Sequence, residues 1–391
     1  MFERRYLPAV VVALAAALVL VIGLWATDKN STPAAAVAAD GATESNPQYQ
    51  WKLVTTWPKN LPGLGSGPEN FARYVNEMSG GRLQVRVFGA GEIVPAFEVF
   101  DAVSQGAAEA GHGASYYWKG KIPASVFFTA IPFGMTAQEM NGWLHYGGGL
   151  ELWQELYEPF GVIPFAGGSS GVQMAGWFNR ELKSKDDLVG LKMRIPGLAG
   201  EVFDAAGGTA VRIAGGEVYT SMQTGVIDAV EWVGPYNDRT LGLQEVAEFY
   251  YYPGWHEPGA MLEFTVNAAA YNKLPADLQA VVKYAARAAN QAMLDEFTAR
   301  NNESLQQLLA SGTQLRPLPE DIVALLYEKT VLAMTKLRAE DPMADKIARS
   351  YNSFADSVRA YHEISERAYL NARDAVLPPV MPDSQRGDQG R

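Results

Sequence analysis

The spacing of apolar side chains predicts alternating strands and helices over the first third of the chain that folds. Alternating apolar and polar residues indicate half-buried strands, and apolar residues three or four apart indicate one face of a helix. The order strand, helix, strand, helix, strand is typical of a parallel α/β sheet. The predicted elements are a strand over 51–57, a helix that Pro68 opens and Gly80-Gly81 stops, a strand over 83–87, a helix over about 96–104 and a strand within 107–117.

A second alternating stretch follows a short strand predicted at Val162–Phe165. The run Gly167–Gly171 predicts a flexible loop, which either crosses between domains or points backbone N–H groups at an anion. Strands and helices alternate again from about Gln173 to Gly259, and a strand near Glu263–Asn267 is expected to return to the first unit. The pattern therefore predicts two α/β lobes.

The C-terminal part of the chain is predicted to be helical. An uninterrupted helical pattern runs from Pro275 to Leu309, about 50 Å at 1.5 Å per residue, which is long enough to span both lobes. Two further helical stretches, 319–339 and 344–374, carry broader apolar stripes than the edge of a domain needs. These stripes fit either a dimer surface or simple packing.

The N-terminus has the pattern of an export signal. Two arginines precede an uncharged apolar stretch of about twenty residues, which is longer than a usual signal core. Residues 1–26 are therefore interpreted as either a cleaved signal peptide or a membrane anchor. Residues 27–50, rich in Ala, Ser, Thr and Pro, predict a linker, and residues 376–391 predict a disordered tail. In both cases the folded part is expected in the periplasm, free or tethered to the inner membrane.

Composition and charge exclude several classes of protein. A chain of 391 residues is too long for one ordinary core, which agrees with two lobes. The 32 basic and 43 acidic side chains give a net charge of −11, and no basic stripe indicates nucleic-acid binding. The absence of cysteine excludes disulfides and thiolate sites, and four histidines disfavour a multi-histidine zinc site. An anionic ligand would have to be held by local positive charge.

Arg194 is the first candidate for that charge. It ends an apolar strand and is followed by Ile-Pro196-Gly197, so its side chain is aimed into a cleft or at a buried partner. Its planar guanidinium matches a carboxylate with two parallel hydrogen bonds. An internal salt bridge with Asp228 or Glu217 is the alternative.

Glu231 and Trp232 end the next predicted strand, 226–230. A carboxylate there can bind a metal ion, accept a ligand hydroxyl or pair with an arginine. Trp232 either forms a wall for the apolar part of a ligand, with its carbonyl oxygen available to a hard cation, or simply packs in the core.

Further candidates surround these residues. Glu257 lies in an aromatic-rich turn, where a carboxylate is costly to bury without a cation. His256 is either a ligand or a hydrogen-bonded structural residue. Gln173 offers a neutral amide oxygen, and the pair Tyr116-Tyr117 offers hydroxyls from the opposite lobe.

Enzyme motifs are weak in this chain. Glu231 and Glu257 as a glycosidase pair lack any further supporting signature, and the His-Glu-x-x-His motif is absent. No catalytic residue is predicted.

Together these motifs resemble the extracytoplasmic solute-binding subunit of tripartite ATP-independent periplasmic (TRAP) transporters, the DctP-like family, over about residues 51–375. The strand that ends in Arg194 and the block 216–231 carry the resemblance most specifically. Gln173, Glu231-Trp232 and the segment 255–258 are similar to the branch that binds small 2-oxo or 2-hydroxy monocarboxylates with a metal ion.

The resemblance implies an α/β, two-lobed periplasmic-binding-protein fold (type II-like) with a long helix spanning both lobes and C-terminal helices. It also implies a dimer through those helices and delivery of the ligand to a membrane permease. The expected division is lobe I at 51–172 plus 261–310, lobe II at 173–260 and C-terminal helices at 311–375.

The family's site residues carry over by position. The resemblance implies that Arg194 clamps the substrate carboxylate and that either Tyr116 or Tyr117 meets the substrate. It implies metal ligands at the residues Gln173, Glu231, Trp232 (through its backbone) and Glu257.

Charge counting compares the two cations that the resemblance permits. Two glutamates, one arginine and a monocarboxylate sum to −2, which calcium would neutralise and sodium would leave at −1. Oxygen ligands suit either ion and disfavour copper or zinc. The alternative functions are a metal-assisted lyase or hydrolase with Glu257 or His256 as base, and a membrane-anchored sensor domain.

Overall fold

The computed structural model describes residues 49–378. The expected signal peptide or anchor (1–26), residues 27–48 of the expected linker and residues 379–391 of the expected tail lie outside the described residues. The linker prediction is two residues too long, because Tyr49 and Gln50 already belong to the first strand. Within the described range, none of the helices combines the length and the apolar character that a bilayer crossing requires.

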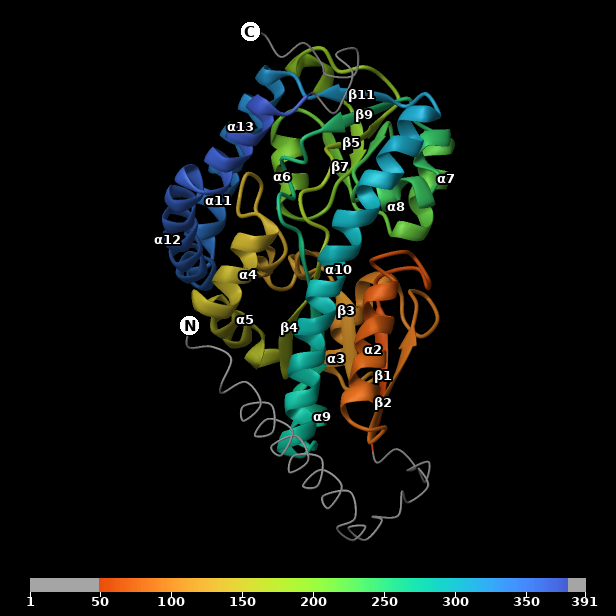
Figure 1. Ribbon diagram of the computed structural model, residues 1–391, viewed down its shortest axis with the longest axis vertical. Coiled ribbons are helices and arrows are strands. Elements are labelled where there is room, and N and C mark those ends of the chain that lie inside the picture. Colours follow the sequence, from red (N-terminus) through yellow and green to blue (C-terminus); the bar gives the residue numbers. More distant parts are fainter. Residues whose placement is uncertain (1–48, 379–391) are drawn as a thin grey trace, which may run out of the picture. The chain divides into compact units, whose positions relative to one another are not determined.

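Five strands form the first sheet, in the order β2-β1-β3-β10-β4 (Figure 1). β1 is parallel to β2 and β3, whereas β10 is antiparallel to β3 and β4. We call this sheet and its helices lobe I. Its strands are β1 (Tyr49–Thr55), β2 (Leu83–Phe88), β3 (Ala110–Gly113), β4 (Val162–Ser169) and β10 (Met261–Asn267).

The helices of lobe I confirm the predicted β-α-β-α-β order. Phe71 on the first helix stacks on Phe264 of β10 with ring centroids 4.3 Å apart, which joins helix to sheet. That helix ends before Gly80 and Gly81, whose φ angles of 60° and 81° leave the helical region. The helices are α2 (Ser66–Met78), α3 (Val99–Ser104), α4 (Ala137–Tyr146), α5 (Gly149–Tyr157) and α9 (Ala268–Asn272), with 3₁₀ turns η1 (Ala96–Glu98), η2 (Ser115–Trp118), η3 (Pro123–Phe128) and η4 (Glu158–Phe160).

Six strands form the second sheet, in the order β11-β9-β5-β8-β6-β7. The run β8-β6-β7 is parallel, and β5 is antiparallel to both β8 and β9. We call this sheet and its helices lobe II. Its elements are β5 (Gly176–Phe178), η5 (Lys185–Leu188), β6 (Lys192–Arg194), α6 (Gly197–Ala205), β7 (Thr209–Val211), η6 (Gly215–Glu217), α7 (Val218–Gln223), β8 (Ala229–Val230), α8 (Pro235–Thr240), η7 (Leu243–Glu245), β9 (Phe249–Tyr252) and β11 (Gln314–Pro317).

One long helix, α10 (Ala276–Ala310), packs on α2 and β4 of lobe I and on α8 of lobe II (Figure 1). The predicted two-lobed α/β fold with a bracing helix is thus confirmed. One strand differs from the prediction: β11 pairs with β9 in a stretch where only helices are expected.

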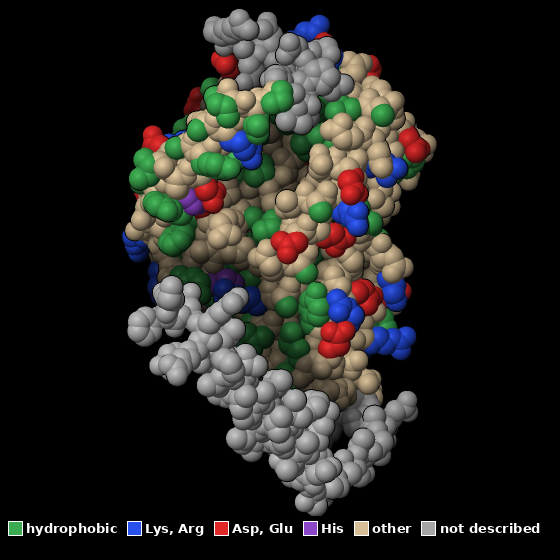
Figure 2. Space-filling model, in the orientation of Figure 1, with side chains coloured by type: hydrophobic (Ala, Val, Ile, Leu, Met, Phe, Trp, Pro, Cys, Tyr) green, Lys and Arg blue, Asp and Glu red, His purple; other side chains and the backbone are tan. Residues whose placement is uncertain are grey.

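The C-terminal helices are α11 (Glu320–Glu340), α12 (Pro342–Ile364) and α13 (Glu366–Val376). The helix predicted over 344–374 is therefore wrong in being continuous, since it breaks at Ser365. No residue of α13 is buried. Figure 2 shows hydrophobic side chains gathered over these C-terminal helices.

Two segments, 170–175 and 253–260, cross between the lobes side by side. They are joined by backbone hydrogen bonds, including one from the Gln173 N–H to the Glu257 carbonyl at 3.2 Å. The prediction of a flexible loop over 167–171 is wrong for its first three residues, because β4 continues to Ser169. A Cβ on Gly167 would lie 2.6 Å from the backbone of β10, so this glycine permits close packing of strands rather than flexibility.

Candidate functional site

Arg194 and Glu231 lie at the carboxyl ends of two neighbouring parallel strands. β6 ends at Arg194, β8 ends one residue before Glu231, and the Glu231 N–H donates to the Arg194 carbonyl at 3.0 Å. Both side chains are buried. Arg194 Nη1 donates to Glu231 Oε2 at 3.0 Å and to the Glu231 carbonyl at 2.7 Å. Arg194 therefore forms the internal salt bridge that was the alternative to a ligand contact, but its partner is Glu231 and not Asp228 or Glu217.

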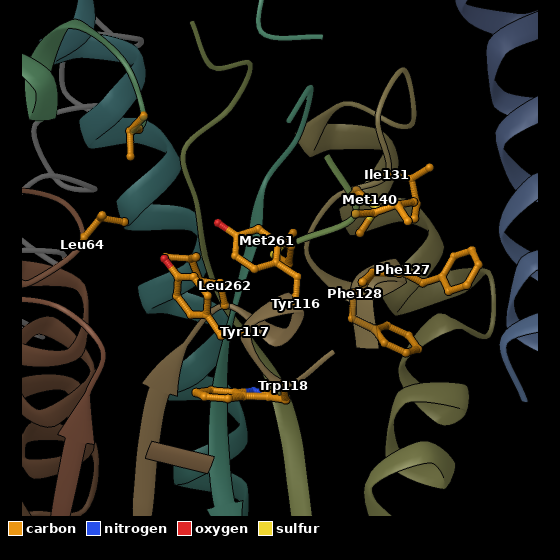
Figure 3. Packing of buried hydrophobic residues seen from close by; sticks show 14 of the residues in the cluster. Leu64, Tyr116, Tyr117, Trp118, Phe127, Phe128, Ile131, Met140, Met261 and Leu262 are labelled. Atoms are coloured by element: carbon orange, nitrogen blue, oxygen red, sulfur yellow. The ribbon is translucent and has the colours of Figure 1, made fainter. Parts of the chain in front are cut away.

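The free edge of the Arg194 guanidinium faces lobe I. Its Nη2 donates to the Tyr117 hydroxyl at 3.3 Å, and its carbon lies 4.8 Å from the centroid of the Trp232 ring. Gly197, with φ of 69°, allows this approach of the lobes, because a Cβ there would meet the Tyr116 ring at 3.0 Å. Figure 3 shows the hydroxyls of Tyr116 and Tyr117 pointing away from Trp118.

Gln173 and Glu257 come from the two crossing segments. Gln173 Nε2 donates to Ser170 Oγ at 2.9 Å and to Glu257 Oε2 at 2.8 Å. Both amide hydrogens are therefore used, which fixes the orientation of the amide and leaves its oxygen as the free acceptor.

Several buried polar atoms in this cluster lack a partner. In the part of the chain that the structure describes, no hydrogen bond reaches Gln173 Oε1, Glu231 Oε1 or either ring nitrogen of His256. Ligand atoms of Glu231, His256 and Glu257 lie within 4.8 Å of one another. Buried polar groups nearly always have partners, so these oxygens fit the coordination of a cation.

Burial shifts the protonation of the cluster. It raises the pKa of Glu231 to about 7, although Arg194 acts in the opposite direction. It raises the pKa of Glu257 to about 8, the nearby Glu231 adds to the rise, and a hydrogen bond from Tyr116 lowers it in part. A bound cation would favour the ionised form of both carboxyls.

His256 is a neutral member of the cluster. Burial lowers its pKa to about 4, so the 3.4 Å contact between its Nε2 and Glu231 Oε1 is not an ion pair at neutral pH. The sequence left two interpretations of His256, a ligand or a hydrogen-bonded structural residue. Both ring nitrogens lack partners within the described residues, so the second interpretation is wrong.

Arg194, Gln173 and Glu257 line a small cavity between the lobes, whereas Glu231 and His256 lie outside its lining. Its volume is about 20 Å³, room for one water-sized particle, so a larger ligand needs the lobes to part. Sequence reasoning missed part of its lining, although Trp57 ends the first predicted strand and Leu64 lies in the glycine-rich loop after it. The lining residues are Trp57, Leu64, Tyr116, Tyr117, Ser170, Gln173, Arg194, Trp232, Val233, Glu257 and Leu262.

Comparison with known proteins identifies a family for this chain. Residues 53–338 match the family described as bacterial extracellular solute-binding protein, family 7 (DctP). A relative from Nostoc sp., a monocarboxylate 2-oxoacid-binding periplasmic protein, is 44% identical over 83% of this chain and 89% of its own length.

Solved structures of TRAP solute-binding proteins share the fold. The protein from Bordetella bronchiseptica, a dimer with calcium and picolinate, is 35% identical with a TM-score of 0.83, covering 84% of this chain and 98% of that one. The protein from Colwellia psychrerythraea, with calcium and pyruvate, is 42% identical with a TM-score of 0.81, covering 83% and 99%. The protein from Pseudoalteromonas atlantica, with sodium and pyruvate, is 41% identical with a TM-score of 0.81, covering 83% and 98%.

The match spans nearly all of the described residues, and the family resemblance seen in the sequence is confirmed. Members of this family are extracytoplasmic solute receptors rather than enzymes. The chain belongs to the DctP family of bacterial extracellular solute-binding proteins, the receptors of TRAP transporters.

Proposed function

We propose that this protein binds a short 2-oxo monocarboxylate together with a calcium or sodium ion between its lobes, and delivers the acid to a TRAP permease. One observation carries the proposal: in the described residues, a buried guanidinium converges with two buried carboxyls and an amide, and one carboxyl oxygen, Glu231 Oε1, and the amide oxygen, Gln173 Oε1, lack partners. Relatives that bind pyruvate with calcium or sodium support the choice of ligand.

The proposed roles follow from the contacts. Arg194 binds the carboxylate of the acid, with the Tyr117 hydroxyl beside it, since that hydroxyl already lies 3.3 Å from Nη2. Tyr116 instead faces Glu257. The cation is coordinated by Gln173 Oε1, by both glutamates and by the backbone carbonyl of Trp232, whose ring packs against Arg194.

Net charge favours calcium in a site this buried. Glu231, Glu257, Arg194 and a monocarboxylate sum to −2, which a divalent ion neutralises. Sodium leaves a net charge of −1 unless one carboxyl keeps its proton. The raised pKa of Glu257 allows this carboxyl to stay protonated near neutral pH. An uncompensated charge is expensive at such burial.

Ligand capture requires movement of the lobes. The cavity is too small for the acid, so we propose that the crossing segments that hold Gln173 and Glu257 bend to open it and that the ligand selects the closed arrangement.

The quaternary and cellular arrangement is also a proposal. Exposed Tyr361, Ile364, Tyr369 and Leu370 on α12 and α13 fit a homodimer interface. Replacing Ile364 and Tyr369 by serine should convert a dimer to a monomer in light scattering, and a wild-type monomer would contradict this. For the segment 1–26 we propose cleavage and release into the periplasm. The mass of the protein recovered from cells distinguishes this from a retained anchor.

The binding proposal is tested by calorimetry with pyruvate in the presence of calcium, of sodium and of a chelator. Binding is expected with either cation, and the chelator should weaken it. Recovered acid should be unchanged by proton NMR. Absence of binding in all three conditions, or conversion of the acid, would overturn the proposal.

A further inference from the structure

We infer that Trp57, fixed in place by His112, is the wall that limits how long the side chain of the bound acid can be. The inference rests on the proposed function and adds a selectivity that the family assignment does not give.

The lining of the cavity divides into a polar and an apolar part. The carboxylate and 2-oxo groups need Arg194 and the cation ligands, so the remaining side chain of the acid must meet the apolar part. That part consists of Trp57, Leu64, Val233 and Leu262, in addition to the Trp232 ring behind Arg194.

Trp57 is larger than Leu64, Val233 and Leu262, and it packs against two aromatic residues that contact Arg194. Its ring centroid lies 6.3 Å from that of Trp232 in an edge-on arrangement and 6.0 Å from that of Tyr117. Only 3% of Trp57 is exposed. It therefore closes the cavity beside these two aromatic residues.

His112 prevents the indole from turning aside. Trp57 Nε1 donates to His112 Nδ1 at 2.8 Å, so the proton of this imidazole resides on Nε2, which donates to the Gly167 carbonyl at 3.0 Å. The imidazole also lies against Phe264, with ring centroids 4.7 Å apart. A histidine with both nitrogens bonded and no exposed surface has no alternative position to adopt.

The backbone beneath Trp57 is held as firmly as its ring. The Trp57 N–H donates to Thr55 Oγ1 at 3.1 Å, and the Trp57 carbonyl accepts from the Ala90 N–H at 2.9 Å. Because neither ring nor backbone can yield, an acid that reaches the wall is rejected instead of accommodated.

The experiment measures selectivity as a ratio of dissociation constants. Calorimetry with calcium present compares pyruvate with unbranched 2-oxo acids of four, five and six carbons. For the wild type, affinity should fall once the chain reaches the wall. Trp57→Leu should extend the limit, so that the ratio between the six-carbon acid and pyruvate changes by about tenfold in favour of the longer acid.

Matched variants distinguish the loss of the Trp57 wall from a general loss of stability. Trp153→Phe, a buried tryptophan outside the cavity, should leave the ratio unchanged. His112→Phe, which removes the acceptor of the indole, should relax the ratio while pyruvate still binds, and His112→Gln, which keeps an acceptor, should restore it. If Trp57→Leu does not fold, the His112 pair carries the same test.

The outcomes distinguish the two proposals. If Trp57→Leu binds pyruvate with the same ratio of dissociation constants as the wild type, Trp57 does not limit the length of the acid, and the proposed function stays intact. Where Trp57→Leu does not fold, the same result in His112→Phe leads to the same conclusion. A wild type that binds none of the acids overturns the proposed function and the wall with it.

Discussion

Two pairs of buried carboxyl groups in this protein, Glu231 with Glu257 and Asp238 with Glu263, differ in what their oxygens bond. Burial raises the pKa of Asp238 to about 7 and of Glu263 to about 8, the same values that Glu231 and Glu257 have. By pKa alone, the four carboxyls are indistinguishable.

Their hydrogen bonds separate them. Asp238 accepts from the backbone N–H groups of Val233 and Gly234, the Trp177 indole and the Tyr250 hydroxyl. Glu263 likewise has donors on both oxygens, from Trp118 and Tyr157. In the described residues, by contrast, Glu231 Oε1 has no partner, and neither does the neighbouring Gln173 Oε1. A raised pKa thus marks burial alone, whereas two unpartnered oxygens in one cluster with a buried arginine, those of Glu231 and Gln173, mark the place proposed for a cation.

The largest effect is expected from Arg194→Met. Losing the charge-assisted contact to the acid should weaken pyruvate binding by about tenfold to a hundredfold, which corresponds to about 1.5–3 kcal/mol. Calorimetry with calcium present measures it. Arg316→Met, which removes a half-exposed arginine paired with Glu181, is the control and should bind as the wild type does. Equal affinity of the two variants would remove Arg194 from the site.

The comparison itself is tested by two matched substitutions. Glu257→Gln should reduce the enhancement of pyruvate affinity by calcium about tenfold, because it removes a charged ligand. Glu263→Gln, equally buried, should leave that enhancement unchanged. If both variants respond to a chelator as the wild type does, Glu257 is not a ligand of the cation.

A smaller effect concerns stability and pH. The folded pKa of Glu263, about 8, lies above its ordinary value of 4.5, so this group stabilises the fold fully below pH 4.5 and its contribution is lost as pH rises to about 8. Glu263→Gln should therefore flatten the fall of the unfolding free energy over that window. Urea titrations at pH 5 and pH 8.5 in the presence of a chelator measure the difference. A variant with the same pH slope as the wild type would show that Glu263 is ionised in the fold.

The sequence predicts the positions of Arg194 and Glu231 because parallel strands deliver the residues at their carboxyl ends to one edge of a sheet. Gln173 and Glu257 are candidates from the sequence, and the resemblance implies that both are metal ligands. The reason that they meet is the hydrogen-bonded pair of crossing segments, which the sequence does not reveal. Neither the spacing nor the composition indicates that Arg194 bonds Glu231 instead of Asp228.

The part that sequence patterns do not reveal depends on long-range packing. Trp57 and His112 are 55 residues apart and meet only because β1 and β3 are neighbours in the sheet. Gly167 and Gly168 look like a loop in the sequence, yet they lie in β4 because β10 and α10 approach too closely for a side chain. Asp238 and Glu263 carry no motif that separates a structural carboxyl from a ligand.

The most direct test is a crystal structure of the protein grown with pyruvate and calcium. The anomalous signal of calcium should lie about 2.3–2.6 Å from oxygens of Gln173, Glu231 and Glu257, with the pyruvate carboxylate on Arg194. Calcium bound away from these oxygens, or pyruvate held without Arg194, would contradict the account.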